Sequence, residues 1–560
     1  MRMTVALSVL LVTAALLLPG FTAAQPATRE VVVGTLFEPD TLNLLLTEAP
    51  VVFTVTSVLA TTRTFDVALD GNWRPVTRGV AALPNLQDGT WKVAGNQMTL
   101  QWRLRPRRWH DGRPVTCGDY VFSHAVARNP EVGSVPSDLN LTPLIANVSC
   151  PAGADGPVVA VAYNQRYAYA NLTITEFGPL PRHVLEGVYR RNPSRLRDAP
   201  FGNEAAATIG DGAYRIVAWK KGASLTAEAA GAHPVLGTPG IKRITWRFFP
   251  DFNTVAAAAV DGKVDAVTAI TFGSQFVRAL ALERQTGGRL RAVLQPGVNW
   301  EHIDFNLDHP IFKDVRVRQA LAHAVDREAI TTRLLEGRVP VAHAYLPPEH
   351  PDYADAIPKY RYDPGRARAL LREAGFTPGA DGILRDSAGD RLSLELITTE
   401  GFRAPVAQMV GQYWSQIGVD VQLTSFPARV MFDLIGRRRF KAAALYGWVY
   451  GPTYDCDQLY TIEGIPTEAN AWQGANIPGY RNAAMDRLCR AASREIDETA
   501  RRRLVHESLR LFARDLPALP LYFGVRTAVA RKELAGFSLG FPCLACPLTE
   551  TWNAHLWAWR

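Results

Sequence analysis

The sequence predicts a mixed α/β protein that is divided into several lobes. Three segments far apart in the chain, residues 251–270, 403–423 and 501–523, each have the pattern of a helix, a turn and a strand. Units of this kind bury one face of the helix against a sheet, which is the α/β arrangement. At 560 residues the chain is also too long for one hydrophobic core, so two or three lobes are expected.

The first of these segments is DFNTVAAAAVDGKVDAVTAI, residues 251–270. We expect Asn253 or Thr254 to cap a helix that runs through the alanines and ends at Asp261-Gly262. The KVDAV that follows alternates apolar and polar residues, which is typical of a strand. This segment therefore predicts a helix packed on a strand of a sheet.

The other two segments repeat this order. In residues 403–423, apolar side chains recur at helical spacing as far as a glycine, and VDVQL then alternates as a strand. Residues 501–523 contain a helical stripe made of Val505, Leu509 and Phe512. The apolar DLPALPLYF follows this stripe and predicts a buried strand.

Two further segments predict their own local structure. Residues 90–115 alternate around Gly95-Asn96 and Asp111-Gly112, which indicates a β-hairpin and a tight turn. Residues 302–330 open as a strand and continue into a helix that Asp314 can cap. The apolar face of that helix is made of Val317, Leu321 and Ala324.

The N-terminus has the parts of a secretory signal. Arg2 is followed by an apolar run and by small residues that end at Ala24. The run breaks at Pro19-Gly20, short of the ~20 apolar residues that a membrane span needs, so we expect cleavage after Ala24. The first cysteine is Cys117, so no lipid anchor is expected. The sequence predicts a signal peptide over residues 1–24 and a periplasmic mature protein.

The charges do not point to a nucleic-acid partner. The formal net charge is +8, and the densest basic points are the RRR runs at 437–439 and 501–503. A nucleic-acid interface would show a basic stripe with aromatic platforms, whereas these runs fit solvated helix faces. Export also argues against nucleic acid.

Six cysteines in an exported protein suggest disulfides. Chain order offers Cys117 with Cys150, Cys456 with Cys489, and Cys543 with Cys546. Six cysteines allow fifteen pairings, so this pairing is a hypothesis. The CLAC motif could also be half of a zinc site or a redox pair, but no second CxxC accompanies it.

No catalytic or cofactor motif is present in the sequence. We find no HExxH, GxSxG, Walker A or GxGxxG, and His506-Glu507 lacks the second histidine of a zincin. No enzyme activity, cofactor or metal is therefore expected. A hydrolase triad that is assembled only in the folded chain is kept as the alternative from another class.

Several motifs resemble the solute-binding proteins of ABC importers in the peptide/nickel/oligopeptide class, family 5. The most specific is FNLDHPIFKDVRVRQALAHAVDREAI in residues 305–330. The other motifs, which stand in the order of that family, are TLNLLL, WRLRPRRWHDGRPVTCGDYVFSHAVA, GDGAYRIVAWKKGASLTAE, RYDPGRARALLREAGF, GWVYGPTYD and RDLPALPLYF. The resemblance covers nearly the whole mature chain.

This resemblance implies a fold like that of periplasmic binding proteins, with two ligand-clamping lobes joined by a hinge and an extra smaller lobe. The implied boundaries are residues 25–65, 201–298 and 516–560 for the first lobe, 66–200 for the second and 299–515 for the third. Ligand would be held between the first and third lobes and delivered to an ABC permease in the inner membrane after hinge closure. A monomer is expected.

The resemblance also places a binding site. In oligopeptide-binding members, a Gly-Trp-x-x-Asp segment supplies a carboxylate for the free amine of the peptide. Here GWVYG puts Gly451 at that position. Asp455 and Asp457 lie a few residues on and could substitute if the loop folds back, or Asp455 could only cap a loop next to Cys456. The expected ligand-contacting residues are Glu48, Trp300, His302, Trp448, Tyr450, Tyr454 and Asp455.

The resemblance and the glycine at position 451 suggest two kinds of ligand. The main expectation is a peptide or a related small solute. Gly451 favours as the alternative a ligand without a free amine, such as a modified peptide, an oligosaccharide or a metal chelate. Large aromatic residues are more often part of a core than of a site, but Trp448, Tyr450 and Tyr454 lie so close together near the expected cleft that they suit its wall.

Overall fold

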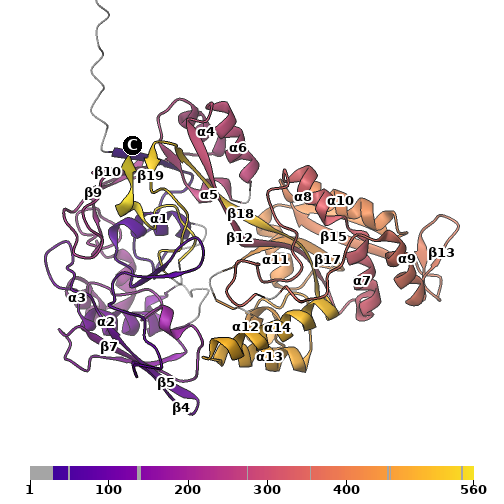
Figure 1. The fold of residues 1–560 in the computed structure, drawn as a ribbon, viewed down its shortest axis with the longest axis horizontal. Coiled ribbons are helices and arrows are strands. Elements are labelled where there is room, and N and C mark those ends of the chain that lie inside the picture. Colours follow the sequence, from indigo (N-terminus) through magenta and orange to yellow (C-terminus); the bar gives the residue numbers. More distant parts are fainter. Residues whose placement is uncertain are drawn as a thin grey trace, which may run out of the picture.

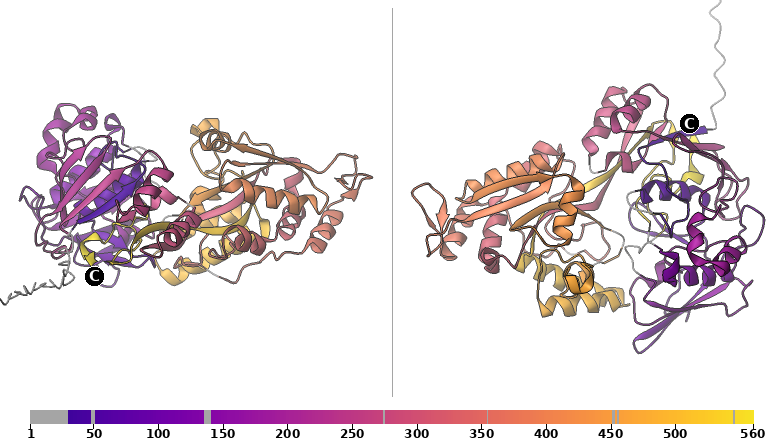
Figure 2. Two further views of the ribbon diagram at one scale, coloured as in Figure 1. Left: turned by 90° about the horizontal axis from the view of Figure 1, so that it is seen from above. Right: turned by 180° about the vertical axis from the view of Figure 1, so that it is seen from behind.

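The computed structural model describes residues 30–47, 51–134, 141–273, 275–353, 355–450, 453–454, 456–543 and 546–560. The expected signal peptide lies outside these residues. Figures 1 and 2 show two halves, with the N-terminal and C-terminal parts of the chain in one half and most of residues 299–515 in the other. Among the described residues, no helix is both long enough and apolar enough to cross a membrane.

A mixed sheet of ten strands runs through both halves. Its order is β16-β15-β17-β12-β18-β11-β1-β10-β9-β8. The strands are β1 (Glu30–Thr35), β8 (Tyr214–Lys220), β9 (Ser224–Ala229), β10 (Arg243–Phe248), β11 (Ala266–Val267), β12 (Leu290–Phe305), β15 (Ser393–Thr399), β16 (Asp420–Phe426), β17 (Ala443–Val449) and β18 (Ala518–Arg531).

Two long central strands connect the halves. Strands β12 and β18 pair antiparallel from Leu290 with Arg531 to Asp304 with Ala518, and Figure 1 shows them crossing between the halves. Their register shifts between Pro296 and Asn299 and again after Glu301. Such bulges bend and twist a strand pair locally. The expected lobe boundary after residue 298 falls inside β12, and the exact boundaries stay a prediction.

Helices cover both faces of the sheet in the N-terminal half. Alternate residues of β1 face opposite sides: Val31 packs with helix α1 (Val52–Thr62), and Val32 packs with helices α4 and α6. The other helices here are α4 (Phe252–Val260), α5 (Ala269–Phe272) and α6 (Phe276–Gln285). The expected cap of α4 is wrong by two or three residues, because Asp251 accepts the hydrogen bond from the Thr254 backbone N–H.

A second, smaller sheet lies in the same half. The predicted hairpin is confirmed as β4 (Trp91–Ala94) and β5 (Gln97–Arg103), with Gly95 in the turn at a φ of 60°. Its sheet order is β4-β5-β7-β6. The remaining elements of this region are β2 (Val67–Leu69), β3 (Pro75–Thr77), β6 (Ile145–Ser149), β7 (Val158–Tyr163), α2 (Cys117–Arg128) and α3 (Arg182–Arg191).

In the other half, α7, α9 and α10 pack on one face of β15 and β17, and α11 packs on the opposite face. As predicted, Asp314 caps α7 by accepting a hydrogen bond from the backbone N–H of Arg316 at 2.8 Å. The helices are α7 (Val315–Ala324), α8 (Arg327–Leu334), α9 (Pro364–Glu373), α10 (Arg403–Ser415), α11 (Ala428–Gly436), α12 (Cys456–Leu459), α13 (Ala483–Arg494) and α14 (Glu498–Asp515).

Short elements complete the chain. The short strands are β13 (Thr377–Pro378), β14 (Leu384–Arg385), β19 (Leu534–Ala535) and β20 (Ala558–Trp559). The 3-10 helices are η1 (Pro130–Val132), η2 (Ala170–Leu172), η3 (Pro193–Asp198), η4 (Pro310–Lys313), η5 (Glu468–Asn470) and η6 (Ala554–Leu556).

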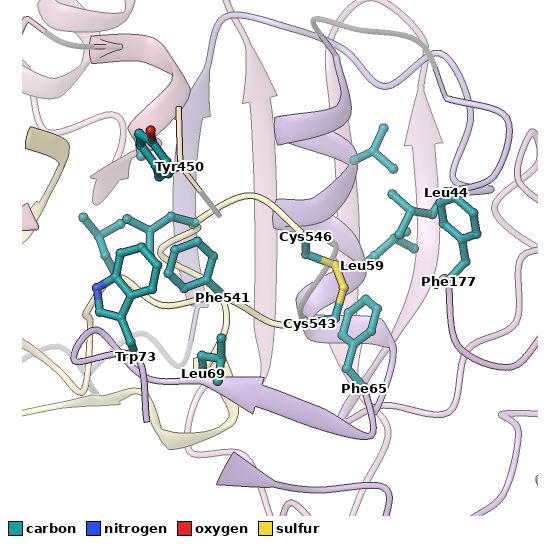
Figure 3. Packing of buried hydrophobic residues seen from close by; sticks show 14 of the residues in the cluster. Leu44, Leu59, Phe65, Leu69, Trp73, Phe177, Tyr450, Phe541, Cys543 and Cys546 are labelled. Carbon is teal, nitrogen blue, oxygen red and sulfur yellow. A yellow bond between two sulfur atoms is a disulfide. The ribbon is translucent and has the colours of Figure 1, made fainter. Parts of the chain in front are cut away.

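The structure contains three disulfides with the pairing that chain order offered. Their S–S distances are 1.98 Å for Cys117–Cys150, 1.89 Å for Cys456–Cys489 and 2.03 Å for Cys543–Cys546. The first ties the start of α2 to the end of β6, and the second ties α12 to α13. The third lies among buried apolar side chains near Phe65 (Figure 3).

Candidate functional site

Polar side chains gather on one face of β12 and β18, where these strands pass between the halves. Asn299 pairs with Gly524 and Glu301 pairs with Tyr522, and directly paired residues share a face. Because side chains alternate along a strand, Arg526 lies on the same face, two residues beyond Gly524. We call Asn299, Glu301, Tyr522 and Arg526 the polar stripe.

Glu301 forms a buried ion pair with Arg403, the first residue of α10. Arg403 Nε and Nη2 lie 2.7 and 2.8 Å from the two carboxylate oxygens, and Asn299 donates a third hydrogen bond at 2.8 Å. Burial lowers the pKa of Arg403, but the charge of Glu301 outweighs that effect and holds the pKa above its usual value. The two charges therefore neutralise each other within the protein.

The ion pair sits directly over the backbone of β17. A Cβ atom on Gly447 would lie 2.6 Å from Glu301 Oε1 and 2.7 Å from Arg403 Nη2. No side chain fits at this position unless the pair moves. Glycine at 447 thus lets the paired side chains lie flat across the sheet.

The hydroxyl of Tyr522 is a buried donor. Its oxygen has no hydrogen-bond partner among the residues that the structure describes, and the residue is 3% exposed. Burial, with the charge of Glu301 in second place, holds the pKa of Tyr522 well above its usual value. Tyr522 therefore stays neutral and keeps its proton for an acceptor.

Arg526 is a buried cation. Its guanidinium carbon lies 4.5 Å from the ring centroid of Phe53 on α1, and its Nε and Nη2 have no hydrogen-bond partner within the described part of the chain. Burial lowers the pKa of Arg526 to about 10, and Glu550 acts in the opposite direction. The side chain is therefore still charged at neutral pH.

The aromatic residues expected at the site form a buried cluster, and two of its members, Trp300 and His302, lie on the face of β12 opposite the stripe. The ring of Trp300 stacks on that of His302 with centroids 3.7 Å apart, and it packs edge-on against Tyr450 at 6.4 Å. Tyr454 hydrogen-bonds the hydroxyl of Tyr345 at 2.9 Å. Trp300, His302, Tyr450 and Tyr454 are at most 3% exposed. This burial fits a packing role, and ligand contact by them stays a prediction.

The other expected residues differ in position. Trp448 is partly exposed near the end of β17, beside Val449, which is 50% exposed. Figure 3 shows Tyr450 in the same buried hydrophobic cluster as Trp73 and Phe541. Glu48, Gly451 and Asp455 lie outside the described residues, so the structure tests no amine-binding role for them.

A polar contact bridges the halves. The hydroxyl of Tyr169 donates to Asp352 at 2.9 Å, and Arg501 pairs with the same carboxylate at 3.1 Å while its guanidinium carbon lies 5.2 Å from the Tyr169 ring centroid. The backbone N–H of Ala168 also donates to the carbonyl of Ser493 at 2.8 Å. Residues 168–169 of one half are thus held to the other half.

A hollow in the N-terminal half is a weaker candidate. It is lined in part by Arg107, His110, Arg215 and His233. Both ring nitrogens of His110 and of His233 already have backbone hydrogen-bond partners, as is usual for structural histidines. Within the described residues, no group of three or more His, Cys, Asp or Glu side chains is arranged to hold a metal ion.

The sequence motifs did not point to Tyr522 or Arg526. A signal for Arg526 was present, because it is a charged residue inside the apolar run ALPLYFGVRTAV. A charge within a buried strand needs either a partner in the fold or a ligand. The sequence alone does not show whether a partner exists.

Comparison with known proteins places the chain in a family. The model of the bacterial extracellular solute-binding proteins, family 5, matches residues 82–465. The oligopeptide-binding protein AppA of Bacillus subtilis is 24% identical over 460 residues, which is 80% of this chain and 78% of AppA. Five Brucella proteins described as putative ABC transporter peptide-binding proteins match over 51% of this chain and of their own length.

Solved structures show the same fold. The oligopeptide-binding protein of Thermus thermophilus, in complex with a pentapeptide, has a TM-score of 0.71 at 24% identity and covers 95% of this chain and 97% of its own. NikZ of Campylobacter jejuni, in complex with Ni(L-His), has a TM-score of 0.71 at 22% identity and covers 95% of this chain and 100% of its own.

Proposed function

Because the chain belongs to the bacterial extracellular solute-binding proteins of family 5, we propose that it captures a peptide or a related small solute between its two halves and delivers it to an ABC permease. AppA and the pentapeptide complex of the Thermus thermophilus protein favour a peptide. The polar stripe carries the proposal, because Tyr522 and Arg526 present buried donors without partners among the described residues at the junction of the halves.

The two long strands would act as the hinge. Closure of the halves around a solute would shift the population toward a shape that a permease recognises. In this proposal the protein works as a periplasmic monomer that binds its solute without turnover. A permease and an ATPase encoded beside it would support transport over a sensing role.

A thermal-shift screen of the mature protein tests the proposal. The screen compares short peptides, the same peptides N-acetylated, oligosaccharides and nickel chelates. A ligand at a hundredfold its dissociation constant stabilises the folded state by about 2.7 kcal/mol, which such a screen detects. We expect peptides to raise the melting temperature, and a screen in which no peptide does so would contradict peptide capture.

The variant Tyr522→Phe makes the test specific to the stripe. It removes a hydroxyl that has no partner in the described structure, so the solute-free protein should keep its stability. If the solute accepts this hydrogen bond, affinity should fall by about 0.5–1.5 kcal/mol, which isothermal titration measures. Unchanged affinity for every ligand would place the solute elsewhere.

Gly451 favours the second candidate, a solute without a free amine. An ammonium buried without a carboxylate is costly, and this chain has glycine where oligopeptide-binding members have the aspartate. The Ni(L-His) complex of NikZ is a case of a metal chelate in this fold. Equal shifts with free and acetylated peptides would favour this candidate, whereas a large gain in affinity for free peptides in Gly451→Asp would count against it.

A further inference from the structure

We propose that Arg526 binds an anionic group of the solute, a carboxylate, at the end of the polar stripe in the N-terminal half. The inference deepens the proposed function and rests on it. Arg526 is not among the ligand-contacting residues that the family resemblance implied. The inference is carried by the burial of the guanidinium, by its Nε and Nη2 atoms, which have no hydrogen-bond partner among the described residues, and by its position on β18, a strand that runs between the halves.

Arg526 differs from the other buried arginines of this protein. The guanidinium of Arg107 pairs with Asp66 at 3.1 Å and Asp211 at 2.7 Å. Arg78 and Arg327 donate to backbone carbonyls at 2.6 Å. Arg526 is 6% exposed, and its Nε and Nη2 have no such partner in the parts of the chain that the structure describes. A buried charge left in this way is costly, which favours a partner supplied from outside.

The groups that surround Arg526 compensate its charge only in part. The face of the Phe53 ring attracts the cation, with 4.5 Å between the guanidinium carbon and the ring centroid. Glu550 is the nearby carboxylate, but its oxygens accept hydrogen bonds from Ser57 at 2.8 Å and from the backbone N–H of Ala269 at 3.2 Å. No ion pair joins Glu550 to Arg526 within the described residues.

The position of Arg526 also favours an anion. Phe53 lies in the first turn of α1, and Val51 before it gives this helix no side-chain cap. The N-terminus of a helix carries a partial positive charge and unpaired N–H groups, so it adds to the field of the guanidinium. Thr56, one turn further along α1, has a buried hydroxyl without a partner in the described structure.

The rest of the stripe indicates which charge the solute carries and where its polar groups lie. Glu301 and Arg403 neutralise each other, so the uncompensated charge of the described stripe is positive. Tyr522 lies four residues from Arg526 along β18, which is roughly 13 Å at the usual rise of a strand. The solute should therefore place a carboxylate at Arg526 and a neutral acceptor at Tyr522.

Isothermal titration of three peptides tests the proposal and separates the two sources of a carboxylate. The probes are pentaalanine, its C-terminally amidated form, and the amidated form with one alanine replaced by glutamate. For the wild-type protein we expect amidation to weaken binding at least tenfold if the terminal carboxylate is bound. Recovery with the glutamate peptide would assign the contact to a side-chain carboxylate instead.

The variants Arg526→Met and Arg526→Lys show whether this residue is responsible. Arg526→Met should bind the free and amidated peptides equally, whereas Arg526→Lys should keep part of the preference. The control Arg437→Met changes an arginine in an exposed pair with Asp433 and should keep the whole preference. If Arg526→Met preserves the wild-type ratio of affinities, the proposal is overturned.

A second measurement needs no ligand. In urea unfolding of the solute-free protein, Arg526→Met should be at least as stable as the wild type, because it removes a buried charge whose Nε and Nη2 have no hydrogen-bond partner among the described residues. The comparison variant Arg107→Met breaks two ion pairs and should lose stability. An equal loss in both would make Arg526 structural and end the proposal. If no peptide of the thermal-shift screen binds the wild type, peptide capture fails, and the urea comparison still decides the role of Arg526.

Discussion

Replacing Glu301 with glutamine removes the negative member of the buried pair while keeping the shape of the side chain. Arg403 would lose a partner at 2.7 and 2.8 Å, and its side chain is 12% exposed. Breaking a buried ion pair from one side costs about 3–5 kcal/mol, because the other charge stays buried without compensation. The partial exposure of Arg403 places the expected loss near the lower end, at about 3 kcal/mol.

Urea unfolding of four proteins measures this loss. The matched control is Asp433→Asn, which breaks an exposed pair with Arg437 and should cost less than about 1 kcal/mol. The double variant Glu301→Leu with Arg403→Met removes both charges and should lie close to the wild type, since apolar replacements of a buried pair are often neutral. If Glu301→Gln costs no more than Asp433→Asn, the pair does not stabilise the junction of the halves as described.

Three further predictions concern the halves and the disulfides. Asp352→Asn should weaken the contact with Arg501 and lower solute affinity by favouring the open form, as titration would show; unchanged affinity would mean that the contact does not support closure. Burial raises the pKa of Asp352, but Arg501 outweighs that effect and holds the pKa below its usual value. The stability that this carboxylate contributes is therefore present above the unfolded pKa and is lost as the pH falls below about 4. This acid-induced loss of stability should vanish in Asp352→Asn. Replacing Cys456 and Cys489 with serine should lower stability by about 2–4 kcal/mol, and an unchanged urea midpoint would contradict this.

The local elements were largely set by the sequence itself. The turn at Gly95, the cap of α7 by Asp314 and the buried stripe of Val505, Leu509 and Phe512 all follow from the spacing of nearby residues, and the structure confirms each one. The cap of α4 is Asp251, which differs from the predicted Asn253 or Thr254. Several residues in DFNT can accept an N-terminal hydrogen bond, and only the path of the chain selects one of them. Helix capping and side-chain periodicity depend on short-range contacts, which a sequence pattern records.

The candidate site depended on tertiary structure. Trp300 and Tyr450 are aromatic residues whose packing could not be told from ligand contact until their neighbours were known, and the structure buries them together. Arg526 became a candidate only when β18 paired with β12 and brought it against Phe53 on α1, hundreds of positions away in the chain. Whether a charge has a partner is a property of the folded neighbourhood, because desolvation and pairing arise from contacts between segments that are distant in sequence.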